Sequence, residues 1–495
     1  MDIKLLKDKI LQLAIQGKLV PQDENDEPAS VLLEKIRAEK EQLIKDKVIK
    51  KDKSLPDIKE EEKFIELPKG WEWTKIQKIA FVTKLAGFEY TKNIAPNLDD
   101  NGTVKLLKGK NIRNGNIILE CEDKINLDVS LELQRSALTK KCLLTPFVGT
   151  LGNVAIFNEK ERYHLGANVA KIELFNNFEL KILEEYIKYY LLSIYGEKEL
   201  TKHSKSTAQS SISMEAIRDT IVLIPPLEEQ KRIVAKVDEL FELIDELDNN
   251  KQELLDSISN TRNKVLQLAI QGKLVEQCED DEPASVLLER IKAEKEQLIK
   301  DKVIKKEKSL PEISEEEKVF DLPKGWEWCR FGRATICRDG ERVPVSSKER
   351  QDRAKIYDYY GASGVIDKID DYLFDIPLLL IGEDGANLIS RSTPIAFIAK
   401  GKYWVNNHAH VIDSTNLATL KYLEVYLNAI DLKPYVTGTA QPKLNQANLN
   451  KIPISLPPLG EQKRIVAKVE LIMNYLDTLK QEIESQEVIL ENILK

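Results

Sequence analysis

The sequence lacks the residues that build metal centres and disulfide frameworks. Its 495 residues include five cysteines and four histidines, widely spaced and without a C-x-x-C pair. We therefore exclude a zinc finger and expect no metal ligands, with reduced thiols in a cytoplasmic protein. Apolar runs such as Ile376–Ile381 fall far below the ~18 residues of a membrane span, and the chain opens on an amphipathic pattern rather than a signal peptide. We expect no membrane partner.

Motifs of enzymes that modify or cleave DNA are also missing. An amino-methyltransferase needs a polar residue before Pro-Pro and an aromatic residue after it, but Pro225-Pro226 and Pro457-Pro458 are flanked by Ile or Leu. No G-x-x-x-x-G-K-[ST] loop is present to hold a nucleotide phosphate. The acidic residues that follow Pro56 are too close together to converge on a nuclease metal from separate strands. We therefore expect no catalytic residue and no cofactor in this chain.

What the sequence does contain is a long internal repeat. Residues 11–73 align without a gap with 266–328, where 52 of 63 positions are identical, and 225–237 align with 457–469, where 12 of 13 are identical. The predicted segments are a helical half-arm (1–73), a first variable block (74–224), a central helical arm (225–328), a second variable block (329–456) and a C-terminal half-arm (457–495). Two equivalent halves with divergent blocks indicate one mechanical role performed twice and two different recognition roles.

The arms have the apolar spacing of a coiled coil. Gly17 and Gly272 predict the end of one helix, and Pro28 and Pro283 predict the start of the next. A helix over 228–271 would be about 65 Å long. Alternating four- and three-residue steps, interrupted by the polar residues Lys251, Thr261 and Gln486, join the apolar positions Ile233, Val237, Leu240, Ile244, Leu247, Leu254, Ile258, Val265 and Leu268, and Ile465, Val469, Ile472, Leu476, Leu479, Ile483, Leu490 and Ile493.

The blocks alternate short β-rich runs with turns, and each block ends in a helical pattern. We expect strands within 152–157, 168–174 and 393–405, and helices within 184–196 and 421–430. The predicted fold class is α+β, with two globular α/β domains separated by long antiparallel coiled-coil helices in a circular pseudo-two-fold repeat.

Charge is divided between the two kinds of segment. The chain carries −8 in total, but the arms sum to −13 and the blocks to +5. A nucleic-acid surface needs local positive charge, so this distribution permits DNA binding by the blocks.

Each block is preceded and followed by a repeated motif. L-P-x-G-W-x-W leads into the blocks at Leu67–Trp73 and Leu322–Trp328, and P-P-L-x-E-Q-x-x-I follows them at Pro225–Ile233 and Pro457–Ile465. In this order the motifs resemble the specificity (S) subunits of type I restriction–modification systems, and the resemblance covers essentially the whole chain. LLIGEDGA and WVNNHAHV in the second block are phrases that recur in target-recognition domains of this family.

The resemblance implies a function. Each block would be a target-recognition domain that reads one half of a split, asymmetric site on double-stranded DNA. The arms would set the spacer between the halves and dock two modification (M) subunits, which bring S-adenosylmethionine and methylate adenine at N6. Restriction (R) subunits would add translocation and cleavage that need ATP and Mg. The S chain itself would be non-catalytic.

Candidate DNA contacts in the first block lie in basic, polar stretches. Asn can pair with adenine and Arg with guanine, but Asn-Gly is also a hairpin signal, so these residues either contact DNA or build a turn. A second loop and its counterpart in the other block either contact the DNA backbone or cap a helix. The candidates are Lys108, Lys110, Asn111, Arg113 and Asn114, then Lys205, Ser206, Thr207, Gln209 and Ser210, and in the second block Thr439, Gln441 and Lys443.

The second block has a dense group of cations and tyrosines near its start. The candidates there are Arg338, Arg342, Lys348 and Arg350, and the alternative is a solvated face of ion pairs. Asn406 and Asn407 are candidate base readers or turn residues. His408 and His410 have the spacing of metal ligands, but a buried or hydrogen-bonded structural role is favoured.

Two other functions compete with DNA recognition. One is a coiled-coil scaffold that displays protein-binding domains, and the other is the recognition fragment of a fused restriction–methylation enzyme. Salt-dependent binding to duplex DNA would separate the first from a DNA-recognition subunit. The four tryptophans of the leading motifs are interpreted as anchors that pack each block on its arm.

Overall fold

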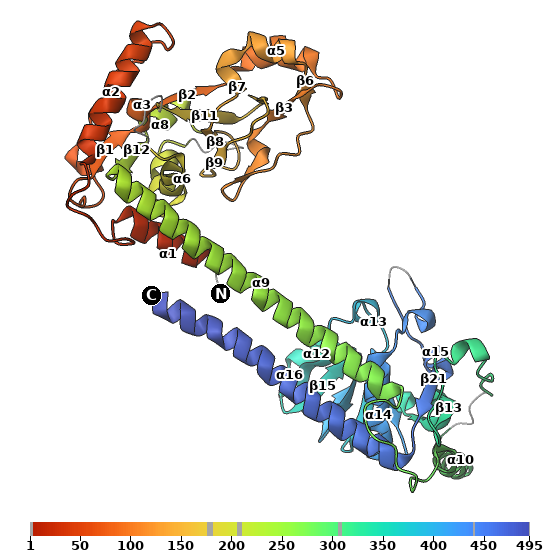
Figure 1. Ribbon diagram of the computed structural model, residues 1–495. Helices are drawn as coiled ribbons and strands as arrows, with labels where there is room; N and C mark the ends of the chain where they lie inside the picture. The colour runs from red at the N-terminus through yellow and green to blue at the C-terminus, as the bar shows by residue number, and fades with distance from the viewer. Residues whose placement is uncertain (1–2, 176–181, 205–209, 305–308, 439–440, 495) are drawn as a thin grey trace. The chain divides into compact units, whose positions relative to one another are not determined.

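The computed structural model describes residues 3–175, 182–204, 210–304, 309–438 and 441–494 (Figure 1). The chain forms two compact units, which we call unit 1 (Met1–Asn250 with Glu487–Lys495) and unit 2 (Lys251–Gln486). The boundary falls inside the 44-residue helix α9 (Leu227–Ile270), so each unit contains part of it. Among these residues we find no helix with the length and apolar character needed to cross a bilayer.

Unit 1 combines the helices of the first half-arm with the first block. Its helices are α1 (Ile3–Ile15), α2 (Ala29–Lys45), α3 (Ile76–Ile79), α4 (Gly87–Glu89), α5 (Leu127–Glu132), α6 (Glu184–Leu192), α7 (Ile194–Thr201), α8 (Met214–Asp219) and the first part of α9. Its strands are β1 (Glu72–Lys75), β2 (Ala80–Lys84), β3 (Val104–Leu107), β4 (Ile112–Arg113), β5 (Asn116–Ile117), β6 (Lys124–Ile125), β7 (Ala137–Leu138), β8 (Cys142–Pro146), β9 (Ala155–Phe157), β10 (Tyr163–Leu165), β11 (Val169–Leu174) and β12 (Ile221–Ile224).

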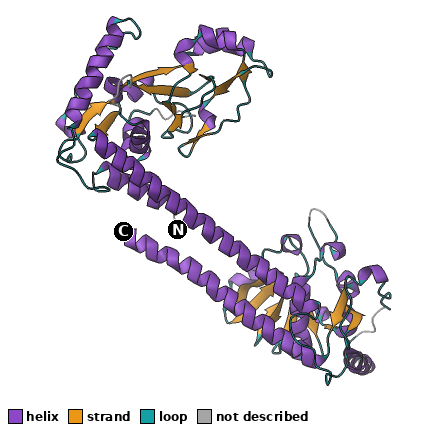
Figure 2. Ribbon diagram, viewed as in Figure 1, coloured by secondary structure: helices purple, strands orange, loops and turns teal. Residues whose placement is uncertain are grey.

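Unit 2 contains the second block between the end of α9 and the last helix. Its helices are α10 (Ala284–Lys300), α11 (Phe331–Ala334), α12 (Ser347–Gln351), α13 (Asn387–Ser390), α14 (Leu417–Ala429), α15 (Gln446–Lys451) and α16 (Leu459–Leu494). Its strands are β13 (Glu327–Arg330), β14 (Ile336–Cys337), β15 (Tyr357–Gly361), β16 (Gly364–Ile369), β17 (Leu378–Gly382), β18 (Ala396–Ala399), β19 (Tyr403–Val405), β20 (Ala409–Asp413) and β21 (Pro453–Leu456). The expected α+β class and the expected block strands and helices are confirmed (Figure 2).

The two blocks share one strand topology although their sequences diverge. An antiparallel sheet has the order β2-β11-β8-β9 in unit 1 and β14-β20-β17-β18 in unit 2. A second sheet in each block contains one parallel pair, β3–β10 in unit 1 and β15–β19 in unit 2. Sequence patterns gave no sign of this common topology, because strand order is set by contacts between distant segments.

Each block begins and ends at the same place on its arm. The first strand pairs antiparallel with the last, β1 with β12 and β13 with β21. The two short ladders bring the leading and trailing motifs together. The sequence between the first and last strands of a block can therefore vary without changing where the block joins its arm.

The arm helices pack antiparallel within each unit. In unit 1, Lys7 of α1 contacts Asp245 of α9 at 2.6 Å, and Gln22, beyond the end of α1, contacts Glu229 at 3.5 Å. Figure 1 shows α1 lying along the first part of α9. In unit 2, Arg262 of α9 forms an ion pair with Asp477 of α16.

The turns between arm helices follow the expected pattern. Gly17 and Gly272 have φ of +66° and +68°, and a Cβ on either would lie 2.5 Å from the ring of Pro68 or Pro323. Glycine is thus required there both by backbone conformation and by space. Helices α2 and α10 begin directly after Pro28 and Pro283, as expected.

The coiled-coil pattern is only partly correct. Ile233, Val237 and Ile244 are buried as expected, whereas Leu247 is 55% and Leu254 54% exposed. Helix α1 begins at Ile3 and its Lys7 contacts Asp245, so the part of α9 well beyond Asp245 extends past α1. In α16, Leu479 is also exposed, at 44%. Apolar spacing predicted a seam longer than the one that forms.

A tryptophan anchors each block on its arm. The buried indole of Trp71 donates from Nε1 to Glu229 at 2.9 Å, and Trp326 donates to Glu461 at 2.8 Å. Burial raises the pKa of both carboxyl groups, although the indole N–H opposes this rise. Each bond joins the residue directly before the first strand of a block to the helix that follows the block. The expected anchoring role is confirmed for these two tryptophans.

We expect Trp326→Phe to lower the free energy of unfolding of unit 2 by about 2 kcal/mol, because it leaves a buried carboxyl group without its donor. Glu461→Gln is the matched control, since it keeps an acceptor oxygen and removes the buried charge, and it should cost much less. Denaturant unfolding at neutral pH measures both variants. Equal losses for the two would show that the indole bond does not hold the strand.

Candidate nucleic-acid interface

Three loops are joined by backbone hydrogen bonds in each block. In unit 1, Phe147 N donates to Asn168 O at 3.1 Å, Ile212 N donates to Phe147 O at 3.0 Å, and Gly149 N donates to Ser210 O at 2.9 Å. We call the loops 147–153, 166–168 and 210–212 the three-loop surface of unit 1. They follow β8, join β10 to β11, and precede α8, respectively.

Unit 2 repeats these bonds with different residues. Glu383 N donates to His408 O at 2.9 Å, Leu444 N to Glu383 O at 2.8 Å, and Gly385 N to Pro442 O at 3.1 Å. The loops 383–387, 406–408 and 441–444 form the three-loop surface of unit 2. The donors Gly149 and Gly385 both have positive φ, +91° and +107°.

Most candidates near the start of the first block serve the fold. Lys108 pairs with Asp123, and Lys110 pairs with Glu122 at 2.5 Å. The buried Asn111 amide donates to Ile118 O and Glu120 O and accepts from Lys108 N, which leaves no group free for a base.

Asn114 and Gly115 form the turn of the β4–β5 hairpin. Their φ values of +50° and +76° are those of a type I′ turn, so the hairpin alternative is confirmed for Asn114. The neighbouring Arg113 is exposed, and its guanidinium has no hydrogen-bond or ion-pair partner among the described residues. It remains a candidate phosphate or guanine contact.

The two polar loops before α8 and α15 are described only in part. Lys205, Ser206, Thr207, Gln209 and Thr439 lie outside the described residues. Ser210 and Gln441 are exposed and lie on the three-loop surfaces. Lys443 is half exposed, and its Nζ lies 3.2 Å from Glu383.

The arginines of the second block are largely paired within the block. Arg338 binds Glu341 and Asp413, and Arg342 binds Glu383 at 2.7 Å. Arg350 binds Asp367 at 2.8 Å and lies over the ring of Tyr359, and its hydrogen bond holds the pKa of Asp367 well below the ordinary value. The alternative of an ion-paired face describes these three residues. Lys348 is exposed and has no partner in the described chain.

Two asparagines in the loop between β19 and β20 looked equivalent in the sequence but differ in exposure. Asn406 is buried and accepts from His408 N at 2.8 Å, as in an Asx turn. Asn407 is exposed. His408 is also exposed, and its Nδ1 lies 2.8 Å from Asp384.

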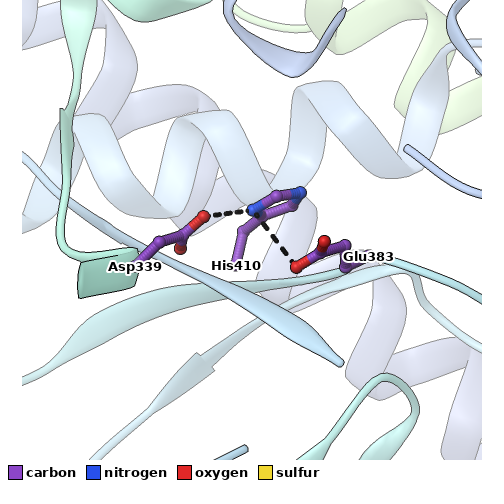
Figure 3. Close-up of side chains that lie close together, drawn as sticks. All are labelled: Asp339, Glu383 and His410. Carbon is purple, nitrogen blue, oxygen red and sulfur yellow. Dashed lines mark hydrogen bonds and ion pairs between the residues drawn. The ribbon is translucent and has the colours of Figure 1, made fainter. Parts of the chain in front are cut away.

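His410 lies in a buried charge network beneath the unit 2 surface. Figure 3 shows its ring between Asp339 and Glu383. Its Nδ1 lies 2.5 Å from Asp339 and 3.9 Å from Glu383, and its Nε2 lies 2.7 Å from Leu444 O. Arg342 completes the network by binding both carboxylates.

The charges of this network are paired with one another. Asp339, Glu383 and His410 are close enough to share an ion. Both ring nitrogens of His410 face oxygen acceptors, and the charged ring that its raised pKa favours donates from both and has no lone pair for a metal. Arg342 and Lys443 already supply positive charge to Glu383. The favoured structural role of His410 accords with this geometry.

The pKa of His410 follows from these contacts. Burial favours the neutral ring, but the hydrogen bond and charge of Asp339, with Leu444 O and Glu383, outweigh burial and raise the pKa above 6.5. Asp339 and Glu383 are held below their ordinary pKa values by the same cations, against the effect of burial. The network ties β20 to the loops after β14 and β17.

Sequence reasoning missed Asp339, Glu383, Asp384 and Asn168. The first lies next to a candidate, and Glu383 and Asp384 lie within the LLIGEDGA phrase. Asn168 stands in the Gly-Ala-Asn turn before β11 and has φ of +63°. The sequence signal for these residues was a Gly-containing turn next to a buried strand. Such turns occur in loops of every kind, so they do not identify a binding residue.

Comparisons with known proteins agree on one family. The family model described as "Type I restriction modification DNA specificity domain" matches residues 68–256 and 334–487. The specificity subunit of the type I restriction enzyme EcoEI from Escherichia coli is 30% identical, over 98% of this chain and 91% of that protein. The EcoAI specificity subunit from Escherichia coli is 29% identical, over 97% and 90%. A solved structure from work on assembly and conformational transition of the type I R-M system shares the fold, with a TM-score of 0.51 and 18% identity over 87% of this chain and 97% of that one.

The buried histidines predict opposite pH dependence in the two units. Because the folded pKa of His410 is raised, its stabilisation of unit 2 is complete below about pH 6.5 and is lost as pH rises through the folded pKa. In unit 1, burial lowers the pKa of His164, although hydrogen bonds to Leu165 O and Leu133 O oppose this. Unit 1 therefore loses stability as pH falls through 6.5, the ordinary value.

Hydrogen exchange of each unit, corrected for the intrinsic rate, measures this from about pH 5.5 to 8. Protection should fall with rising pH in unit 2 and rise in unit 1. His410→Gln should abolish the trend in unit 2 alone. A flat profile for wild-type unit 2 would contradict the assignment of a charged His410.

Proposed function

Because the chain belongs to the family of type I restriction–modification DNA specificity subunits, we propose that its two blocks read the two halves of a bipartite, asymmetric DNA site while its arms dock two modification subunits. The observation that carries this proposal is the contrast between the units. The arms and their anchors are nearly identical, whereas the three-loop surfaces have equivalent backbones and different side chains. Identical docking sites suit two copies of one partner, and different loops suit two different half-sites.

In this proposal the chain supplies recognition and the chemistry belongs to its partners. Modification subunits would hold S-adenosylmethionine and methylate adenine at N6, and restriction subunits would use ATP and Mg for translocation and cleavage. Helix α9 would set the spacer between the half-sites, since one continuous helix of 44 residues contributes to both units.

DNA binding would rest on few phosphate contacts. The blocks carry a small positive excess, and most arginines of the second block are paired internally. Arg113 and Lys348 are the exposed candidate cations without a partner in the described part of the chain. Phosphate contacts position a protein on DNA, whereas groups on the base edges determine the sequence it selects.

The docking surface for modification subunits would lie on the exposed apolar positions of the long helices. Leu243 and Leu247 of α9 are 48% and 55% exposed, and the repeat aligns them with Tyr475 and Leu479 of α16, which are 69% and 44% exposed. Exposed apolar side chains at matching positions of two repeats support two equivalent contacts with one kind of partner.

We expect co-expression with a cognate modification subunit to methylate one bipartite motif, with two different specified halves around a fixed run of unspecified bases. Sequencing of N6-methyladenine in host DNA identifies the motif. Expression of either chain alone is the control and should leave the motif unmodified. Assembly of the two chains without any methylated motif would contradict the proposed function.

We expect Leu247→Glu and Leu479→Glu each to remove one of two bound modification subunits, because a charge replaces an apolar contact. Native mass spectrometry of the co-expressed complex would then show one modification subunit per chain for each single variant and none for the double variant. Leu131→Glu, at a leucine of α5 that is 48% exposed, is the matched control and should keep both. Loss of both subunits in each single variant would show that the two contacts are not independent.

A further inference from the structure

The hydrogen bonds of the three-loop surfaces define residue equivalences that sequence alignment does not show. Asn168 and His408 occupy the same place, because each gives its carbonyl oxygen to the N–H of the residue after the buried strand, Phe147 or Glu383. The bond lengths agree within 0.2 Å, 3.1 and 2.9 Å. The two loops therefore present side chains from one backbone position.

A second pair of positions supports the same alignment. Val148 forms an isolated bridge with Ser211, and Asp384 forms an isolated bridge with Lys443. Val148 and Asp384 each follow the residue that accepts from Ile212 N or Leu444 N. The bridge places a valine in unit 1 where unit 2 has an acid.

In unit 2 the exposed side chain is held in one orientation. His408 is 49% exposed, and its Nδ1 lies 2.8 and 3.0 Å from the two carboxylate oxygens of Asp384. A carboxylate accepts hydrogen bonds, so Nδ1 carries the hydrogen. Nε2 has no partner among the described residues and is left for a ligand. The side chain of Asp384 is only 18% exposed, so it acts as a support.

The loop beneath this pair is fixed by the charge network. Glu383, the residue before Asp384, binds Arg342 at 2.7 Å and Lys443 at 3.2 Å. Its backbone N–H binds His408 O, and its carbonyl accepts from Leu444 N. A side chain that discriminates bases must be placed to within a fraction of an ångström, and this network supplies that rigidity.

In unit 1 the equivalent side chain is an amide. Asn168 is exposed, has φ of +63°, and its side-chain amide has no hydrogen-bond partner within the described chain. The valine at the place of Asp384 offers it no polar support. Asn168 thus presents both a donor and an acceptor to a ligand.

We propose that Asn168 and His408 are specificity-determining residues for the first and second halves of the DNA site, and that Asp384 orients His408. This inference rests on the proposed function. An asparagine amide matches the N6 and N7 groups of adenine, and a histidine with Nδ1 held presents Nε2 to a single group on a base edge. Loops of one backbone design with different exposed groups explain how two similar blocks select different sequences.

The test is the methylated motif of the co-expressed complex with the modification subunit. His408→Ala should relax selection at one base pair of the second half by roughly 5- to 150-fold and leave the first half unchanged. Asn168→Ala should relax selection at one base pair of the first half and leave the second half unchanged. Asp384→Ala should affect the same base pair as His408→Ala, whereas Asp384→Asn keeps an acceptor for Nδ1–H and should retain the wild-type motif.

Lys368→Ala is the matched control. Lys368 forms an exposed ion pair with Asp358 between β16 and β15, outside the three-loop surface, so its loss should leave the motif unchanged. If a variant methylates nothing while its assembly and melting temperature are unchanged, duplexes with each half randomised separately are tested for binding. Selection lost only at the half assigned to the variant supports the inference.

The outcomes separate this inference from the proposed function. A wild-type bipartite motif that persists unchanged in His408→Ala and Asn168→Ala overturns the inference and leaves the proposed function standing. Selection lost at both halves in a single variant also overturns it. A wild-type complex without a bipartite motif overturns both.

Discussion

The rest of the structure depends on the buried indole–carboxylate hydrogen bond that joins each block to its arm. Trp71 and Trp326 directly precede the first strand of their blocks, and Glu229 and Glu461 belong to the helices that follow the blocks. The bond therefore closes each block on its arm after about 130 to 160 residues of intervening chain. A donor and a carboxyl group that are buried together are costly to separate, because neither finds water in its place. Two terminal strands and one indole thus fix the ends, and the interior of the block is free to vary.

That closure accounts for two blocks with one topology and little common sequence. Strand order follows from which segments pair, and pairing needs alternating apolar residues rather than particular ones. The loops between strands keep their backbone hydrogen bonds, such as those of Phe147 and Glu383, because a backbone N–H and C=O are present whatever the side chain is. Side chains on those loops are then the part of the block least constrained by the fold. The same arrangement therefore allows the loop side chains to vary while the backbone topology stays constant.

The repeats, the long helix and the glycine turns could be predicted from sequence because each depends on local spacing. Features that depend on contacts between distant residues could not be predicted from the sequence. Asn111 and Asn406 looked like base readers, but each amide or its oxygen is used by backbone groups a few residues away, which a Gly- and Asn-rich turn does not reveal. The arginine group looked like a DNA face, yet Arg338 and Arg342 find partners 75 and 41 residues along the chain. Leu247 fits the heptad and is exposed, because spacing does not say where the neighbouring helix begins.

The paired arginines also determine what kind of recognition surface the second block can offer. An arginine with a carboxylate at 2.7 or 2.8 Å contributes little net charge to its surroundings, and breaking the pair to reach a phosphate leaves the acid uncompensated. The block therefore uses its cations chiefly to fix loops, as Arg342 does for Glu383. Affinity from counterion release grows with the number of phosphates neutralised, so a surface with few unpaired cations gains little nonspecific affinity. Such a surface depends on its neutral and hydrogen-bonded side chains for selection. Most of the binding free energy must then come from other contacts with the DNA.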